Sequence, residues 1–273
     1  ERMQIKTFLD GAIYFIEFNF RDGRISANKN FRKAIQAVFN TEDLVYKVQG
    51  SPGSYPVYTL YPRWMKGVDK AFVREYPQTK PELNLEKGRQ YMAAAKQELG
   101  YEVFPSITLL AGDSPGSQKS SEYIQTLLKQ TLGLTVKVDA QIFKQRIAKM
   151  TSGDFDLVMA GWGPDYNDLL TYGDLFASYN LNNRGRYNNP EYDRWVEIAQ
   201  SSLEPVVRMQ AFNELQKIIK EDVVILPLYE SGVVYVQHSS LKDVARRAIG
   251  GDPNYNFAYI EAQQKDDKEA TGP

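Results

Sequence analysis

The segment SITLLAGDSPGSQKSSEYIQTLLKQTLGLTVKVDAQIFKQRIAKMTSGDFDLVMA, residues 106–160, decides the fold of this chain. Three short apolar runs in it have the character of buried strands, and the two stretches between them carry apolar residues at helical spacing. We therefore predict strand 106–111, helix 118–132, strand 134–138, helix 140–151 and strand 156–160. This β-α-β-α-β order implies right-handed crossovers and a parallel sheet, whose ligands bind beyond the carboxyl ends of its strands.

Outward from this segment the chain keeps alternating between strands and helices. Residues 12–20 predict a strand, and residues 50–64, with three prolines and two glycines, predict an irregular segment. Further helices are predicted over 30–39, 42–48, 85–99, 190–202 and 205–220, with Asn189 capping the helix at 190. Residues 223–229 and 233–237 predict a strand pair around Glu230, Ser231 and Gly232. We expect an α/β lobe with a mixed sheet and helices on both faces.

The composition excludes several classes of function. Lys plus Arg (33) nearly balances Asp plus Glu (34), so no basic excess is available for nucleic acid. The chain has no Cys and one His, His238, which excludes thiol chemistry and His-rich metal sites. No apolar run reaches the roughly 18 residues of a membrane helix. The 18 tyrosines suit a wet binding surface, although they could equally fill strands.

One motif suggests an enzyme. Residues 112–116 match the G-x-S-x-G nucleophile elbow, with Ser114 as nucleophile and with Asp222 and His238 following in the order of an α/β hydrolase. However, the residue after the nucleophile is Pro115, which lacks the backbone N–H that an oxyanion hole requires. A glycine-rich loop after a strand is the simpler interpretation, and the serine hydrolase remains the alternative.

Several carboxylates gather between residues 154 and 174. Asp154, Asp156, Asp165, Asp168 and Asp174 could in principle form a glycosidase pair or a calcium site. Their spacing fits no calcium-binding loop, and we expect Asp154 and Asp156 to be solvated turn residues. No catalytic residue, metal or cofactor is therefore predicted. The polar loop at 180–189 could contact a ligand, but is better explained as an ordinary loop.

The segment Gly161-Trp162-Gly163-Pro164-Asp165-Tyr166-Asn167-Asp168 follows the third parallel strand. Gly161 and Gly163 would let a ligand backbone approach, and Pro164 would hold Asp165 in place. A fixed carboxylate suits an ammonium group, because charge-assisted hydrogen bonds strengthen in a drier cleft. The alternative is a Trp packed in the core and an Asp that caps a helix near Leu169.

At these residues the chain resembles the extracytoplasmic solute-binding proteins of peptide and nickel ABC importers, and most of all the oligopeptide-binding proteins. The resemblance is carried by residues 155–168, 186–193, 225–229, 31–35 and 254–260, and covers residues 11–260. Family members have about twice this length. The resemblance and the abrupt start of the chain therefore imply the carboxy-terminal half of a periplasmic-binding-protein-like fold. Its parts would be a strand end of the missing lobe or hinge (1–13), the ligand-binding lobe (14–231), a return to the hinge and first lobe (232–262) and a disordered tail (263–273).

The resemblance also implies a function, which is reversible binding of oligopeptides for uptake through an ABC importer. Asp165 would pair with the peptide α-amino group, and the backbone of residues 160–163 would pair with the peptide. Trp162, Tyr166, Asn167 and Tyr229 would line the cleft. Partners would be a peptide and the permease subunits of the importer, but no nucleic acid. We expect a monomer in the periplasm or at the extracellular face, attached to the membrane only through the permease or a lipid anchor outside this chain. Met159 stands where some peptide binders carry a basic residue for the peptide carboxylate, which leaves the handling of that carboxylate open.

Overall fold

The computed structural model describes residues 3–249 and 252–262 and is built around a mixed six-stranded sheet. The strand order is β2-β6-β1-β5-β3-β4. Strands β3, β4 and β5 run parallel, whereas β1 is antiparallel to both β5 and β6. These strands are β1 (Met3–Phe18), β2 (Tyr55–Pro56), β3 (Ile107–Gly112), β4 (Val136–Gln141), β5 (Leu157–Trp162) and β6 (Ile225–His238). The predicted mixed sheet with a parallel β-α-β-α-β core is thus confirmed.

The predicted helices are present, with ends that move by a few residues, and three short helical segments, at 25–27, 72–75 and 170–173, were not predicted. The helices are α1 (Lys29–Val38), α2 (Phe72–Glu75), α3 (Leu85–Leu99), α4 (Pro115–Leu132), α5 (Phe143–Ser152), α6 (Leu170–Gly173), α7 (Pro190–Ser201) and α8 (Pro205–Asp222), with the short helical segments η1 (Ile25–Ala27) and η2 (Asp43–Gln49). The Asn189 side chain accepts from the backbone N–H groups of Glu191 and Tyr192, which confirms it as the cap of α7. Gly133 ends α4 with a positive φ of 68°.

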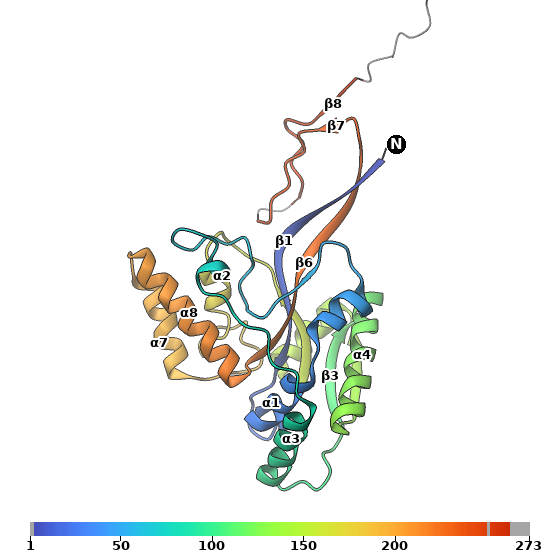
Figure 1. Ribbon diagram of the computed structural model, residues 1–273, viewed down its shortest axis with the longest axis vertical. Helices are drawn as coiled ribbons and strands as arrows, with labels where there is room; N and C mark the ends of the chain where they lie inside the picture. Colours follow the sequence, from blue (N-terminus) through green and yellow to red (C-terminus); the bar gives the residue numbers. More distant parts are fainter. Residues whose placement is uncertain (1–2, 250–251, 263–273) are drawn as a thin grey trace, which may run out of the picture.

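Side chains that alternate along the central strands build a core on each face of the sheet. On β5, Val158 and Ala160 face one core, while Leu157 and Met159 face the other. The first core contains residues of α7 and α8, and the second contains residues of α1, α3 and α4. Figure 1 shows these two helix groups on opposite sides of the central strands. The prediction of helices on both faces is therefore correct.

Strand β6 differs from the predicted strand pair. Residues 225–238 form one continuous strand, and Glu230, Ser231 and Gly232 lie inside it rather than in a turn. Strand β1 pairs with β6 along its length, from Met3 opposite His238 to Glu17 opposite Ile225. Pairing with a distant strand therefore overrides the turn-forming residues of this segment. Beyond the sheet the two strands continue as a ribbon that projects from the lobe (Figure 1).

The ribbon leads to a small two-stranded sheet of β7 (Leu241–Lys242) and β8 (Tyr259–Ile260). Of the segment 254–260, where a final strand was expected, the last two residues form β8. Asn254 forms an isolated bridge with Ala245. The predicted disordered tail at 263–273 lies outside the described residues. In the described ranges, no helix has both the length and the apolar character needed to cross a membrane.

Candidate functional site

The candidate site begins at the point along β5 where its pairing with β3 ends. Strand β3 pairs with β5 at Leu157 and Val158, and the pairing stops there, whereas β1 stays paired with β5 as far as Trp162. The Met159 carbonyl instead accepts a hydrogen bond from Arg146 Nη1 at 3.0 Å. Because backbone groups alternate in direction along a strand, the N–H and C=O of Gly161 face the same edge as that carbonyl. This part of β5 therefore has one edge without a strand partner among the described residues.

The turn after β5 is held by a buried threonine. Thr171 Oγ1 accepts from Trp162 Nε1 at 3.3 Å and from the Asp165 backbone N–H at 3.2 Å. On the other side, Pro164 packs against Gly11 of β1, where an added Cβ would come within 3.0 Å of Pro164 Cγ. Gly11 also has a φ of 78°, so both the close contact with Pro164 and the backbone conformation require glycine at this position. The backbone at Asp165 is consequently fixed from two directions.

The Asp165 carboxylate is exposed, and within residues 3–249 and 252–262 it takes part in no ion pair or side-chain hydrogen bond. The capping role considered for an aspartate near Leu169 belongs to Asp168, whose Oδ1 accepts from the Leu170 backbone N–H at 2.9 Å. Asp168 also makes two bonds with Arg208, at 2.8 and 2.9 Å. The nearby arginine thus neutralises Asp168 and leaves the charge of Asp165 uncompensated.

The surroundings of this turn are negative. Tyr166 is 43% exposed, and its pKa is raised to about 12 by partial burial and then by Asp174, Asp168 and Asp165. The pKa of Asp174 is raised by burial and by the charge of Asp165. The part of each shift that comes from neighbouring carboxylates reflects a local potential that disfavours another anion. An ammonium group would be attracted to the same position.

Gly161 also has a role within this chain. It lies opposite Tyr14 in the ladder, and an added Cβ would come within 2.9 Å of the Tyr14 ring. Gly161 thus makes room for Tyr14 of this chain. At Gly163 an added Cβ would meet no atom within 4 Å, so space for a ligand remains there. The Tyr14 ring in turn stacks on Tyr229, with centroids 4.7 Å apart and planes at 12°.

The two stacked tyrosines line a pocket of about 410 Å³ at the carboxyl ends of β3 and β4. Strand ends Gly112 and Gln141 line it, as expected for a parallel sheet. The rest of its lining is Tyr14, Gln49, Ser51, Ser54, Asp113, Ser114, Gly116, Ser117, Phe143, Arg146, Met159, Tyr229, Ser231 and Gly232. Of the seven predicted ligand residues, Tyr229 alone lines this pocket. Trp162, Gly163, Asp165, Tyr166 and Asn167 belong to the turn beyond Gly161 and the Tyr14 ring.

Sequence reasoning missed Tyr14 and Arg146. Tyr14 lies in a strand whose alternation was recognised, but nothing local indicated that its ring would cover Gly161. Arg146 is in the first turns of α5, directly after the carboxyl end of β4. That position, at the end of a parallel strand, was the one signal that could have drawn attention to it.

The hydrolase alternative receives no support. Ser114 is the cap of α4, and its Oγ accepts from the Ser117 backbone N–H at 3.3 Å. Asp222 accepts from Lys29 Nζ and from the Tyr187 hydroxyl, while His238 Nδ1 is bonded to Ser240. The three groups of the supposed triad therefore have other partners and are not joined to one another.

One expectation about the carboxylates was wrong. Asp154 is solvated, with 64% of its side chain exposed, but Asp156 is 13% exposed. Asp156 accepts from the Thr108 backbone N–H at 2.7 Å and pairs with Arg24 at 3.3 Å, so it ties β5 to β3 and to the start of the lobe. In the part of the chain that the structure describes, no cluster of His, Asp or Glu is arranged to hold a metal ion.

The loop at 180–189 is bonded to itself. Buried Asn183 donates to the carbonyls of Ala177 and Tyr187 and accepts from the Tyr187 backbone N–H. The ordinary-loop interpretation of this segment is therefore the better one.

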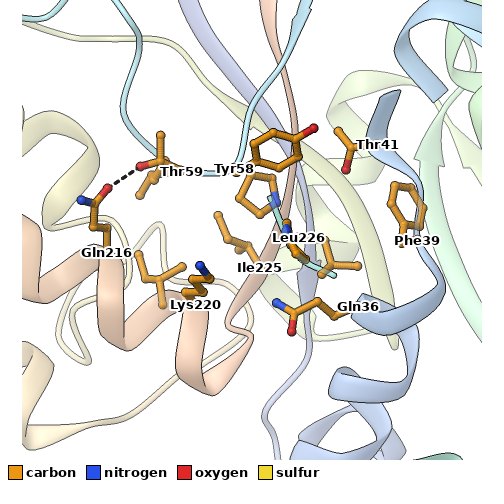
Figure 2. Close-up of a pocket in the computed structure, with 13 residues that line it drawn as sticks. Gln36, Phe39, Thr41, Tyr58, Thr59, Gln216, Lys220, Ile225 and Leu226 are labelled. Atoms are coloured by element: carbon orange, nitrogen blue, oxygen red, sulfur yellow. Dashed lines mark hydrogen bonds between the residues drawn. The ribbon is translucent and has the colours of Figure 1, made fainter. Parts of the chain in front are cut away.

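A second pocket is lined by the first residues of β6 and is small, with room of about 30 Å³. Figure 2 shows it between Tyr58 and Thr59 on one side and Ile225 and Leu226 on the other, with Thr59 hydrogen-bonded to Gln216. This space holds about one water molecule. The Tyr14–Tyr229 pocket, more than ten times larger, is the better candidate for a ligand.

Comparisons with known proteins identify the family. The chain matches the model for bacterial extracellular solute-binding proteins, family 5 Middle, over residues 1–183. It is 25% identical over 239 residues to the dipeptide-binding protein DppE of Bacillus subtilis, which is 88% of this chain and 44% of that protein. Among solved structures it resembles the substrate-binding domain of an oligopeptide ABC transporter from Bacillus anthracis, with 27% identity and a TM-score of 0.86, covering 94% of this chain and 51% of that one.

A second solved structure is Listeria monocytogenes OppA bound to peptide, with 28% identity and a TM-score of 0.83, covering 95% of this chain and 50% of that one. The chain therefore spans about half the length of the proteins it matches. These matches confirm the periplasmic-binding-protein-like fold expected from the sequence. The chain belongs to the bacterial extracellular solute-binding proteins of family 5.

Proposed function

We propose that this chain is a peptide-binding lobe that serves an ABC importer, and that Asp165 binds the α-amino group of the peptide. The observation that carries the proposal is the exposed Asp165 carboxylate, without a partner in the described residues, on a turn that Thr171 and Gly11 hold in place. Because the backbone that carries this carboxylate is held in place, binding an ammonium group costs mainly the conformational entropy of the Asp165 side chain.

The unpaired edge of β5 supports pairing with a peptide backbone. Gly161 and Gly163 alternate with Trp162, so their N–H and C=O groups face the edge that β3 has left. An extended peptide added there would gain main-chain hydrogen bonds that do not depend on its sequence. Its amino end would then lie toward Asp165, where the potential is negative.

The names of the relatives agree with this ligand class. DppE is called a dipeptide-binding protein, and the Listeria structure holds a peptide. We propose by analogy that peptide is the ligand of this chain too. As in the family, the chain would act by binding, not by catalysis, outside the cytoplasm, and it would deliver its ligand as a monomer to the permease subunits.

The projecting ribbon fits the proposed division into lobe and hinge. Residues 3–9 pair with residues 232–238 in the projecting ribbon, and Ile5, Val234 and Val236 on this ribbon are exposed. Exposed β-branched residues on a strand pair are commonly covered by another part of a protein. We propose that this part is the first lobe, which would close over the turn at Asp165.

A test of the function compares two ligands that differ in one group. Amide spectra of the ¹⁵N-labelled chain would be recorded with trialanine and with N-acetyl-trialanine, both at millimolar concentration. Trialanine should shift the signals of Gly161, Gly163 and Asp165, and acetylation should weaken binding because it removes the ammonium charge. Equal binding of the two peptides would refute the role of Asp165, and no shift with either would refute the proposed function.

A further inference from the structure

Arg146 is a cation in the pocket lining that has no anion as partner among the described residues. Its Nη1 donates to the Met159 carbonyl at 3.0 Å, and its Nε is buried with no hydrogen-bond partner. In the described residues it forms no ion pair within 4.0 Å, unlike Arg208 or Arg24. A guanidinium has five N–H donors, so most of the Arg146 donors have no protein acceptor in the described residues.

The charges around Arg146 leave it positive and poorly compensated. Burial lowers its pKa most, Arg184 lowers it further, and Tyr14 and Asp113 act in the opposite direction. Asp113 lines the same pocket but is not within ion-pair distance of Arg146. Removing a cation from water without an ion pair costs free energy, which an incoming anion would recover.

The rest of the pocket lining offers open space and hydroxyl groups. Gly116 lines the pocket at the start of α4, and a Cβ added there would meet no atom within 4 Å. Ser117 and Ser51 add hydroxyl groups to the lining. The Ser117 backbone N–H is already bonded to Ser114 and is therefore not free for a ligand. The positive end of the α4 dipole still adds to the positive potential in the pocket. With about 410 Å³ of space, the pocket can hold a small ligand group beside Arg146.

We infer that Arg146 binds a carboxylate of the ligand in the Tyr14–Tyr229 pocket, and so selects peptides that place a negative charge there. The inference rests on the proposed function. The carboxylate belongs either to the carboxyl terminus of the peptide or to an acidic side chain. A guanidinium suits either, because its planar donors match the two oxygens of a carboxylate.

The alternative is that Arg146 serves only to hold the Met159 carbonyl. The variant Arg146→Gln keeps an N–H donor for that carbonyl and removes the charge, whereas Arg146→Lys keeps the charge. Arg89→Gln is a matched control, since Arg89 also donates to one backbone carbonyl, that of Thr131, but lies on an exposed helix face outside the pocket.

The experiment is a titration of the ¹⁵N-labelled chain with three peptides: trialanine, trialanine amide and Ala-Glu-Ala amide. The readouts are the Nε–H signal of Arg146, assigned by its loss in Arg146→Gln, and the amide signals of Gly116 and Asp165. We expect a peptide with the correctly placed carboxylate to bind about fivefold more tightly than trialanine amide. This preference should vanish in Arg146→Gln and persist in Arg146→Lys and Arg89→Gln.

The three peptides separate the sources of the carboxylate. A preference for trialanine assigns the carboxyl terminus, and a preference for Ala-Glu-Ala amide assigns an acidic side chain. If all three peptides shift Asp165 equally and leave the Arg146 signal unmoved, the inference is overturned while the proposed function stands. If no peptide shifts Asp165 or Arg146, both are overturned.

Discussion

The substitution Asp165→Asn tests the central residue of the site. It preserves the size and shape of the side chain and removes its charge. Because Asp165 is in no ion pair in the described residues, the loss of charge should leave the fold almost unchanged. Any effect on peptide affinity can therefore be attributed to the lost attraction for the α-amino group.

The expected magnitude depends on how dry the site is. In this chain Asp165 is exposed, so its ion pair with a peptide would be worth about 0.2–1 kcal/mol, or up to about fivefold in affinity. We also expect the chain by itself to bind more weakly than micromolar, because half of the cleft is open to water. In a complete two-lobed protein that buries the pair, the same substitution should cost about 2–5 kcal/mol.

The assay has two arms. Amide-signal titration measures the weak binding by this chain, and calorimetry measures binding by a two-lobed protein that contains it. Asp154→Asn is the control for the loss of one exposed negative charge, because Asp154 precedes β5 instead of following it; unlike Asp165 it pairs with Lys149, at 3.1 Å, so the stability of this variant is measured as well. The reasoning is refuted if Asp165→Asn leaves the affinity of the two-lobed protein unchanged, or if Asp154→Asn weakens it equally.

Three further outcomes are expected. Burial raises the pKa of Glu17 to about 7, so the free energy of unfolding of the wild type should fall by up to about 3 kcal/mol as the pH rises from about 4.5 to 7. Urea unfolding should show that this fall disappears in Glu17→Gln. A variant with the same pH profile as the wild type would contradict the prediction. Thr171→Val should lower the free energy of unfolding by about 1–3 kcal/mol and weaken peptide binding, because the indole N–H of Trp162 and the backbone N–H of Asp165 lose their acceptor. Unaltered denaturation and binding curves would argue against this role of Thr171. A fluorophosphonate probe should not label Ser114, and labelling detected by mass spectrometry would restore the hydrolase alternative.

The sequence by itself determined the parallel core of the sheet. In residues 106–160 each strand and helix has its own period and its own end signal, such as Gly133 after α4. Local signals also determined the cap at Asn189. They weakened the hydrolase alternative too, because Pro115 lacks a backbone N–H in any fold. Such features depend on neighbours in the sequence and could be predicted without coordinates.

The tertiary structure decided which charges are free and which residues meet. Asp165 and Asp168 look alike in the sequence, but Arg208, 40 residues beyond Asp168, neutralises one of them and leaves the other exposed. The pocket likewise joins Tyr14, Arg146 and Tyr229 from three separate elements. Strand β6 runs through its turn-forming residues because β1 pairs with it. Pairing of strands and neutralisation of charges depend on partners far along the chain, and no local pattern encodes which partner arrives.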